Sequence, residues 1–435
     1  MTPRVSVFIS ALLISIASVS AQPIEGRYII RLKAGADAHA VARAHGVQPD
    51  YVYSRVLNGM AGFVPPGILK KLAADPSVES ISADHAVYAI GKPGTGGGGT
   101  TPTGEVAPAG AVRIGAFQTG YSGAGVGVAV VDTGLDFNHA DLKGNIAAAS
   151  FNAFNQSAPG QDDQGHGTHV GGTIAATDNT IDVIGVAPLA KLYAVKVLDA
   201  SGSGSDSAVI AGLDWVGANA NSVVPKIRVV NMSLGRSAFG ADVDNPMHEA
   251  ISSLTQANIA VVVAAGNDAT LEARDQVPAG FPEVIAVGST TAKDGIKAKR
   301  INTIIRGDTA SYFTSDGALA ADENGMAGVT VSAPGEEQED IDAAGFIQSV
   351  GILSLKLGGG TTRMSGTSMA SPHVAGVVAQ LWQKYAASGL TPEQIRSVLR
   401  ASALNAGTAP LASPTRNYTY DGEREGIVDA VDALN

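Results

Sequence analysis

An unbroken apolar run, Val126-Gly127-Val128-Ala129-Val130-Val131, leads directly into Asp132-Thr133-Gly134. A continuous apolar run of this length is typical of a strand that is buried on both faces of a parallel sheet. Asp132 then stands at the carboxyl end of the expected strand, where α/β sheets place their functional side chains. The alternative for a lone Asp at such a point is to cap the following turn.

Further apolar runs occur along the chain, and stretches with helical periodicity separate them. The runs are Leu192–Leu198, Arg228–Met232, Ile259–Ala264 and Val284–Val287, and the helical stretches are His169–Ala176, Ala208–Ala218 and Asp244–Ala257. Another helix should begin at the capping box Thr391-Pro392-Glu393-Gln394 and end near Ser402. This alternation predicts an α/β domain over residues 105–435, with a parallel sheet flanked by helices.

The composition excludes several classes of protein. The chain has 435 residues, a net charge of -11, 16% charged residues, 45% hydrophobic residues and no cysteine. A disordered chain would be more polar, and a coiled coil would be richer in Glu, Lys and Leu. The acidic balance argues against a nucleic-acid partner. The absence of cysteine excludes disulfides, thiolate metal sites and a Cys nucleophile.

The N-terminus has the character of a secretory signal peptide, residues 1–21, cut after Ala21. Arg4 precedes the apolar run Val5–Val19, and small residues precede the cut. A membrane anchor is the alternative, but this run is too short to cross about 30 Å of hydrocarbon. We therefore expect a secreted protein, extracellular or periplasmic, with no membrane association once the signal is removed.

Residues 26–90 read as a small α+β domain that precedes the large one. Strands are expected at Tyr28–Leu32, Tyr51–Val56, Gly59–Val64 and Val78–Ala83, and helices at Ala38–His45 and Pro66–Ala74. The order βαββαβ is that of ferredoxin-like units. Because a domain this small buries little surface by itself, we expect it to pack against a partner surface. Residues 91–104 are rich in Gly, Thr and Pro and predict a flexible linker.

Two further segments carry residue types that do chemistry. His166 lies between glycines just before a helical stretch, which would expose its ring; a structural role or, with His169, a metal site are the alternatives. Ser368 should stand at the N-terminus of an apolar helix that runs towards Trp382, with Pro372 in its first turn. Ser368 has two possible roles. The structural role is that of a helix N-cap, and the catalytic role is that of a nucleophile whose developing charge is stabilised by the helix dipole.

Together these residues predict a nucleophilic triad. Serine needs an adjacent base, His166 titrates near neutral pH, and Asp132 could orient the imidazole ring. Asn267, in the turn Ala265-Gly266-Asn267 after an apolar run, could donate its amide to an oxyanion. The alternative for Asn267 is a residue in left-handed conformation.

These motifs resemble the signature blocks of subtilisin-like serine proteases. The blocks are Asp-Thr-Gly at 132–134, His-Gly-Thr-His at 166–169, Ala-Ala-Gly-Asn at 264–267 and Gly-Thr-Ser-Met-Ala-Ser-Pro-His at 366–373. The resemblance implies a subtilisin-like fold, catalytic roles for Asp132, His166, Ser368 and Asn267, polypeptide substrates, and a monomer. It also implies that residues 26–90 are an inhibitory propeptide that acts on its own enzyme, with cleavage between about Ile90 and Glu105.

Two other functions are alternatives to a protease, an esterase and a binding module. An α/β-hydrolase esterase would need Gly-x-Ser-x-Gly and the chain order Ser, Asp, His, whereas Gly366-Thr367-Ser368-Met369-Ala370 lacks the second Gly. An inactive relative that serves as a binding module is the other rival, and autoprocessing would distinguish it from an enzyme.

The resemblance also implies where substrate binds. Two edges should clamp the substrate as an added strand, and the second edge, with a further segment, should wall the primary specificity pocket. The residues are Gly202, Ser203, Gly204, Ser233, Leu234, Gly235, Ala264, Ala265 and Gly266. All are small or apolar and none is charged, so we expect broad specificity with a preference for apolar or aromatic side chains.

Calcium is the ion that the resemblance implies, in a structural role and without a catalytic metal. The implied ligands are Asp141, the Asn179 side chain and the carbonyls of Thr177, Ile181 and Val183, with Glu105 near the position of a further ligand. Oxygen ligands of this kind suit Ca²⁺. A polar surface loop is the alternative.

Residues 297–349 form a stretch that is longer than the family pattern requires. It contains Glu336-Glu337-Gln338-Glu339-Asp340. We expect this charge run to be a solvated face, the alternatives being a second metal site or a partner surface.

Overall fold

The computed structural model describes residues 22–93, 104–238, 242–296, 304–342, 345–414 and 422–435. The expected signal peptide and residues 94–103 of the expected linker lie outside these ranges. No helix in the described ranges combines the length and the hydrophobicity that a membrane span requires.

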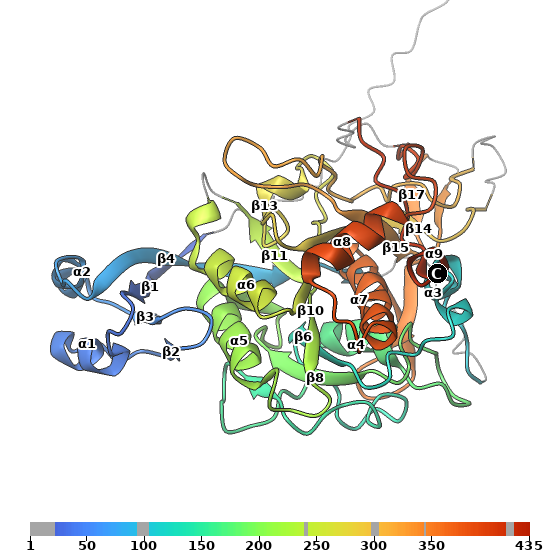
Figure 1. The fold of residues 1–435 in the computed structure, drawn as a ribbon. Coiled ribbons are helices and arrows are strands. Elements are labelled where there is room, and N and C mark those ends of the chain that lie inside the picture. Colours follow the sequence, from blue (N-terminus) through green and yellow to red (C-terminus); the bar gives the residue numbers. More distant parts are fainter. Residues whose placement is uncertain (1–21, 94–103, 239–241, 297–303, 343–344, 415–421) are drawn as a thin grey trace, which may run out of the picture.

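A seven-stranded parallel sheet forms the centre of the large domain (Figure 1), in the order β15-β14-β12-β10-β6-β8-β7. Its strands are β6 (Gly127–Asp132), β7 (Phe151–Asn152), β8 (Lys191–Lys196), β10 (Ile227–Met232), β12 (Ala260–Ala264), β14 (Ile285–Thr291) and β15 (Val331–Glu336). The apolar runs of the sequence supply the five central strands with ends shifted by a few residues. The predicted α/β class with a parallel sheet is confirmed.

Helices cover both faces of this sheet. They are α4 (His166–Ala175), α5 (Asp206–Asn219), α6 (Pro246–Gln256), α7 (Thr367–Lys384) and α8 (Pro392–Ala401), with the short α3 (Ala109–Arg113) and α9 (Ala430–Ala433). Val128 and Val130 share a hydrophobic core with residues of α4 and α7. Ala129 and Val131 share the opposite core with residues of α5 and α6. The alternation of side chains along β6 therefore builds both cores from one strand.

The N-terminal residues fold in the order that the sequence predicts, βαββαβ. The elements are β1 (Pro23–Leu32), α1 (Ala38–His45), β2 (Tyr51–Tyr53), β3 (Gly59–Phe63), α2 (Pro66–Ala73) and β4 (Val78–Ala89). Their apolar side chains form a small separate core that includes Ile30, Met60 and Leu72. These elements lie at one side of the molecule in Figure 1, beside α5 and α6.

The fourth strand is longer than predicted and reaches into the large domain. The sequence indicated a strand only to Ala83, whereas β4 continues to Ala89 and pairs there with β9 (Ser203–Ser205) and β11 (Leu234–Ser237). The N-terminal sheet is thereby continuous with an edge of the large domain. The Asp214 carboxylate on α5 reinforces the contact by accepting hydrogen bonds from the backbone N–H groups of residues 54–56.

The prediction for Pro372 is wrong. Helix α7 begins at Thr367, so Pro372 is its sixth residue and lies beyond the first turn. Gly366 occupies the cap position, so Ser368 is not the helix cap. A proline inside a helix leaves the carbonyl four residues earlier without its usual donor, and here that carbonyl belongs to Ser368.

The expectation of a solvated acidic face at residues 336–340 is also wrong. Glu336 and Glu339 are completely buried, and Glu337 is 9% exposed. Glu336 is the last residue of β15, and Glu339 begins the hairpin of β16 (Glu339–Ile341) and β17 (Ile347–Ser349). The charge pattern of a sequence cannot distinguish a solvated run from one that a neighbouring hairpin covers. The remaining strands are β5 (Lys92–Pro93), β13 (Gln276–Val277), β18 (Ile352–Leu355) and β19 (Thr361–Ser365).

Candidate active site

Asp132 and His166 form a buried pair at the carboxyl end of the sheet. Asp132 ends β6 and His166 begins α4, and His166 Nδ1 lies 2.8 Å from Oδ1 and 3.0 Å from Oδ2 of Asp132. Burial alone would lower the pKa of His166, but the charge and hydrogen bond of Asp132 outweigh burial and raise this pKa above its ordinary value. The pair is therefore poised to hold a proton on the imidazole ring.

Asp162 fixes the two loops that carry this pair, and sequence reasoning missed it. Its carboxylate accepts hydrogen bonds from the Thr133 hydroxyl at 2.9 Å and from the Thr168 hydroxyl at 2.6 Å. The Thr133 hydroxyl in turn accepts from the Gly167 N–H at 2.9 Å. Asp162 stands four residues before His166, and this proximity was the only signal that the sequence offered.

Ser368 lies in the first turn of α7 and exchanges hydrogen bonds with Ser233. The Ser368 hydroxyl donates to the Ser233 carbonyl at 3.0 Å. The Ser233 hydroxyl donates to the Ser368 carbonyl at 2.9 Å, which is the carbonyl that Pro372 leaves free. The helix and the loop after β10 are thus tied at the serine itself.

The Asn267 carboxamide has a fixed orientation. Its Oδ1 accepts hydrogen bonds from Thr367 N at 2.9 Å and from the Thr367 hydroxyl at 2.8 Å. Its Nδ2 donates to the carbonyl of Ile90 at 2.9 Å. The amide that the sequence identified as an oxyanion donor therefore points at a peptide carbonyl of this same chain.

The end of β4 lies in the site as an extended strand held on both sides. Tyr88 pairs with Ser203 on β9 and with Gly235 on β11, both antiparallel. Further hydrogen bonds run from Ala89 N to Gly202 O at 2.9 Å and from Ile90 N to Ser233 O at 3.2 Å. The backbone is therefore held from residue 86 to residue 90, immediately before the carbonyl that Asn267 binds.

The free nitrogen of His166 faces the next residue. His166 Nε2 is buried and has no hydrogen-bond partner among the described residues. The backbone of Gly91 lies so close that a Cβ built on it would be 2.8 Å from His166 Nε2. The His166 ring therefore lies against Gly91, the residue that follows the Ile90 carbonyl.

The residues expected to bind substrate fall into two groups. Those of the two clamping edges, at 202–204 and 233–235, contact residues 87–90 directly. A Cβ on Gly235 would be 3.0 Å from the Ile90 side chain, so this glycine leaves room for it. Ala264, Ala265 and Gly266 lie at the end of β12 and lead into Asn267; they are buried beside the site.

The residues expected to bind calcium also come together. Asp141 accepts hydrogen bonds from the Asn179 side chain at 2.6 Å and from Val183 N at 3.2 Å, and Glu105 accepts from Asn179 N at 2.5 Å. Burial raises the pKa of Asp141 to about 6. The described residues contain no group of three acidic or His side chains suited to a metal.

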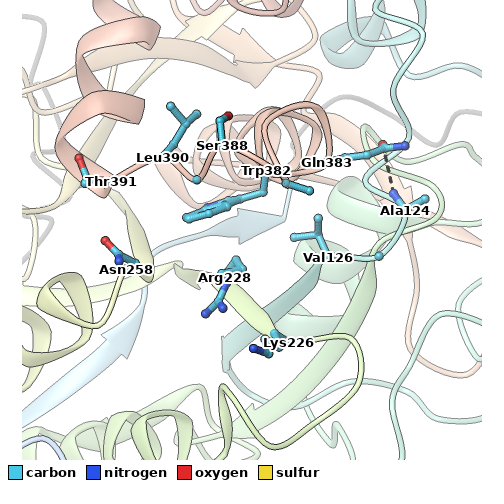
Figure 2. A pocket seen from close by; sticks show the side chains of 13 residues that line it. Ala124, Val126, Lys226, Arg228, Asn258, Trp382, Gln383, Ser388, Leu390 and Thr391 are labelled. Carbon is cyan, nitrogen blue, oxygen red and sulfur yellow. Dashed lines mark hydrogen bonds between the residues drawn. The ribbon is translucent and has the colours of Figure 1, made fainter.

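A cavity of about 690 Å³ lies away from these residues (Figure 2). Lys226, Arg228 and Trp382 line it, and Figure 2 shows both cations on one side of the indole ring. Arg228 is at the beginning of β10 and Val126 precedes β6, whereas Asp132 ends β6 and Ser233 follows β10, at the opposite ends of these strands. The cavity contains none of the candidate catalytic residues.

Known proteins of one family are similar to this chain in sequence and in fold. Residues 123–425 match the family described as "Subtilase family". The chain is 32% identical to subtilisin E of Bacillus subtilis over 88% of its own length and 87% of that protein. It is 35% identical to an extracellular serine proteinase of Thermus sp. over 81% of its length and 73% of that protein. Fervidolysin from Fervidobacterium pennivorans, a keratinolytic enzyme, shares the fold with a TM-score of 0.66 at 24% identity; the match covers 95% of this chain and 61% of fervidolysin.

Proposed function

This chain belongs to the subtilase family and is a serine endopeptidase, and we propose that it is secreted as a zymogen that cleaves itself between Ile90 and Gly91. One observation carries the proposal: the Ile90 carbonyl accepts a hydrogen bond from Asn267 Nδ2 while His166 Nε2 faces Gly91. A peptide bond in that arrangement is oriented as a substrate would be.

The proposed reaction is acyl transfer through a triad of Asp132, His166 and Ser368. Ser368 Oγ attacks the peptide carbonyl carbon while His166 Nε2 accepts the hydroxyl proton. Asn267 Nδ2 and the Ser368 N–H stabilise the tetrahedral oxyanion. His166 then protonates the leaving amine, and the acyl-enzyme is hydrolysed by water that His166 activates. Asp132 keeps the imidazole in the required tautomer throughout.

Residues 22–90 would serve as the intramolecular inhibitor. After cleavage, the new carboxyl end at Ile90 would still be held by the strand pairing with β9 and β11 and by the contact of Asp214 with residues 54–56. Retention by strand addition is a common mode of peptide recognition. The mature enzyme would begin at Gly91, and the signal peptide would direct export, as the name of the extracellular serine proteinase of Thermus sp. suggests.

The segment in the site also suggests the specificity. Ile90 would occupy the primary pocket beside Gly235, and Val87, which is fully buried, would occupy the subsite three residues earlier. Both are apolar, and the described walls contributed by residues 233–235 and 264–266 carry no charge. We therefore expect a preference for apolar residues at these two substrate positions.

A structural calcium ion would be held by Asp141, the Asn179 side chain and the carbonyls of Thr177, Ile181 and Val183. The residues fit such an ion because Asp141 is a buried carboxylate whose pKa is raised by burial and by the nearby Asp182. A bound cation would supply the missing positive charge and cross-link the loop to the segment after β6. It would stabilise the fold and take no part in the reaction.

Labelling of the nucleophile tests this proposal directly. The secreted protein, its Ser368→Ala variant and a Ser388→Ala control, which alters an exposed serine, should be treated with a fluorophosphonate and assayed on an apolar chromogenic peptide. We expect labelling at residue 368 and peptide hydrolysis in wild type and S388A, and neither in S368A. Labelling or hydrolysis that persists in S368A would refute the assigned nucleophile.

A further inference from the structure

Two carboxyl groups are buried together beside the segment that leads into α7 and Ser368. Glu336 is the last residue of β15 and Glu339 the first of β16, and both side chains are 0% exposed. The nearest described cations do not serve this pair, because the side chains of Lys293 and Arg363 both bind Glu337. Neither Glu336 nor Glu339 has an ion-pair partner among the described residues.

Backbone amides hold each carboxyl on one oxygen. Glu336 Oε2 accepts a hydrogen bond from Gly351 N at 2.8 Å, and Glu339 Oε1 accepts one from Tyr312 N at 3.0 Å. The other oxygen of Glu339 is buried without a hydrogen-bond partner in the described structure. The hydroxyls of Ser349 and Ser365 also favour the ionised form of Glu336, but burial of the carboxyl outweighs them. A buried ionised carboxylate is unfavourable, so a proton is the expected occupant of this pair.

The electrostatics of the surrounding groups point the same way. Burial raises the pKa of Glu336 to about 7. Burial and the neighbouring Glu336 raise the pKa of Glu339 well above its ordinary value. Tyr312 also faces the pair, and burial raises the pKa of its hydroxyl, so it adds no charge. Glu337 has a lowered pKa because its two cations outweigh its burial, and it stays ionised and separate.

The pair contacts the structure that positions the nucleophile. The hydroxyl of Ser365, three residues before Ser368, faces the Glu336 carboxyl. The carbonyl of Gly335 accepts a hydrogen bond from Gly366 N at 3.2 Å, and a Cβ on Gly335 would be 2.4 Å from Gly366 O. This packing leaves no room for β15 to shift without moving the cap of α7.

We propose that Glu336 and Glu339 are positioning residues for the start of α7, which carries Ser368, and that they hold it only while the pair keeps a proton. The proposal rests on the proposed catalytic role of Ser368. Loss of the last proton would leave two like charges in a site of low polarity that no described cation serves. The repulsion would separate β15 from β16 and loosen Gly366, so that kcat falls at alkaline pH while KM changes little.

The sign of the stability effect follows from the same groups. Both folded-state pKa values lie above the ordinary value for Glu, so the folded protein binds more protons than the unfolded one. Stability contributed by the protonated pair is therefore present at low pH and is lost as the pH rises through the folded-state pKa of about 7 for Glu336. In Glu336→Gln only Glu339 can still ionise, so this variant should lose less stability as the pH rises.

Melting temperatures of the full chain in the Ser368→Ala background, where self-cleavage is prevented, test the stability effect. The background protein should be compared with its E336Q and E339Q derivatives between about pH 5 and about pH 9. The advantage of E336Q over the background protein should grow with pH. The E337Q control, which alters an ionised neighbour, should differ from the background protein by a constant amount. Equal pH slopes for E336Q and E337Q would overturn the proposal.

Peptide hydrolysis by active E336Q tests the positioning role. The alkaline limb of its kcat should move up by about one pH unit or more relative to wild type, with KM unchanged. A shift in melting alone, with identical kcat profiles, would mean that the pair is only structural and would also overturn the proposal. So would stabilisation by calcium that persists in Asp141→Asn and disappears in E336Q, because a cation would then replace the proton. An inactive wild type would refute the proposed function, and the melting data would still decide the stability effect.

Discussion

The side chain of Asn267 is held in the orientation that a hydrogen-bond donor to an oxyanion needs. Both acceptor positions of its Oδ1 are taken by Thr367, which fixes the carboxamide so that Nδ2 donates to the Ile90 carbonyl. A preorganised donor loses nothing by reorienting when the oxyanion develops, so its effect on the transition state is large. Thr367 is adjacent to Ser368, and the donor and the nucleophile are therefore fixed to the same turn.

Asn267→Leu should lower kcat strongly and leave KM nearly unchanged. The known cost of losing the equivalent amide from a subtilisin, about 10²–10³ in kcat, sets the scale. Thr367→Val, which removes only one of the two donors to Asn267, should cost less. Steady-state kinetics on one apolar peptide would measure both, and a loss confined to KM would contradict the role of Asn267.

The pH dependence of activity should report the environment of His166. Its pKa is raised because Asp132 outweighs the effect of burial, and departure of the N-terminal segment would reduce burial and raise this pKa further. Since the neutral ring is the base, kcat/KM should fall as the pH drops through a value above 6.5.

Asp132→Asn is the matched variant for this pH dependence. It should move the acid limb to lower pH and reduce kcat by roughly 10⁴, the loss known for this change in another serine protease triad. Profiles of kcat/KM against pH for the two proteins would measure the shift. An acid limb at the same pH in both would contradict the assigned partner of His166.

At the scale of elements, the strand β4 lies between β9 and β11, which pair with it through main-chain hydrogen bonds. We propose that an extended substrate is held there in the same way and that side-chain pockets select among substrate sequences. Gly235 allows this approach, because a Cβ on it would lie 3.0 Å from the Ile90 side chain. A Cβ on Gly204 would instead lie 2.3 Å from the Val197 carbonyl oxygen, within the large domain.

Substitution of Ile90 tests the primary pocket. Ile90→Leu should be processed at a rate close to wild type, whereas Ile90→Asp should be processed at least about tenfold more slowly because no described cation lines the pocket. The appearance of the mature fragment over time after inducing expression gives both rates. Equal rates for Asp and Leu would mean that residue 90 does not occupy the pocket.

The elements also show what the sequence could and could not predict. Apolar runs such as Val126–Val131 identify buried strands because a parallel sheet needs apolar side chains on both faces. The length of β4 could not be predicted, since residues 86–89 gain their strand conformation from partners more than a hundred residues away. The burial of Glu336 and Glu339 was missed for the same reason. Pro372 was misplaced because the signal for a helix start is weaker than the packing that extends α7 to Thr367.

At the scale of the whole molecule, calcium should stabilise the fold where disulfides cannot. The chain has no cysteine, and the acidic residues Glu105, Asp141 and Asp182 surround one loop. A ligand that binds only the folded state adds stability in proportion to the logarithm of its concentration over Kd, about 2.7 kcal/mol at 100 Kd.

Removal of calcium should therefore lower the melting temperature of the Ser368→Ala chain. Asp141→Asn, which retains the shape of the side chain and loses its charge, should melt at a lower temperature and respond much less to chelation. Differential scanning calorimetry with calcium and with excess chelator would measure both. Identical melting of the parent under the two conditions would contradict the calcium site.

The most direct test of the central claim is the intact mass and N-terminal sequence of the protein after secretory expression with calcium, for wild type beside Ser368→Ala. We predict that wild type yields a mature enzyme that begins at Gly91 and that the variant keeps residues 22–90 attached. Cleavage of the variant at the same bond, or no cleavage of either protein, would contradict the account that Ser368 cuts the peptide bond held by Asn267 and His166.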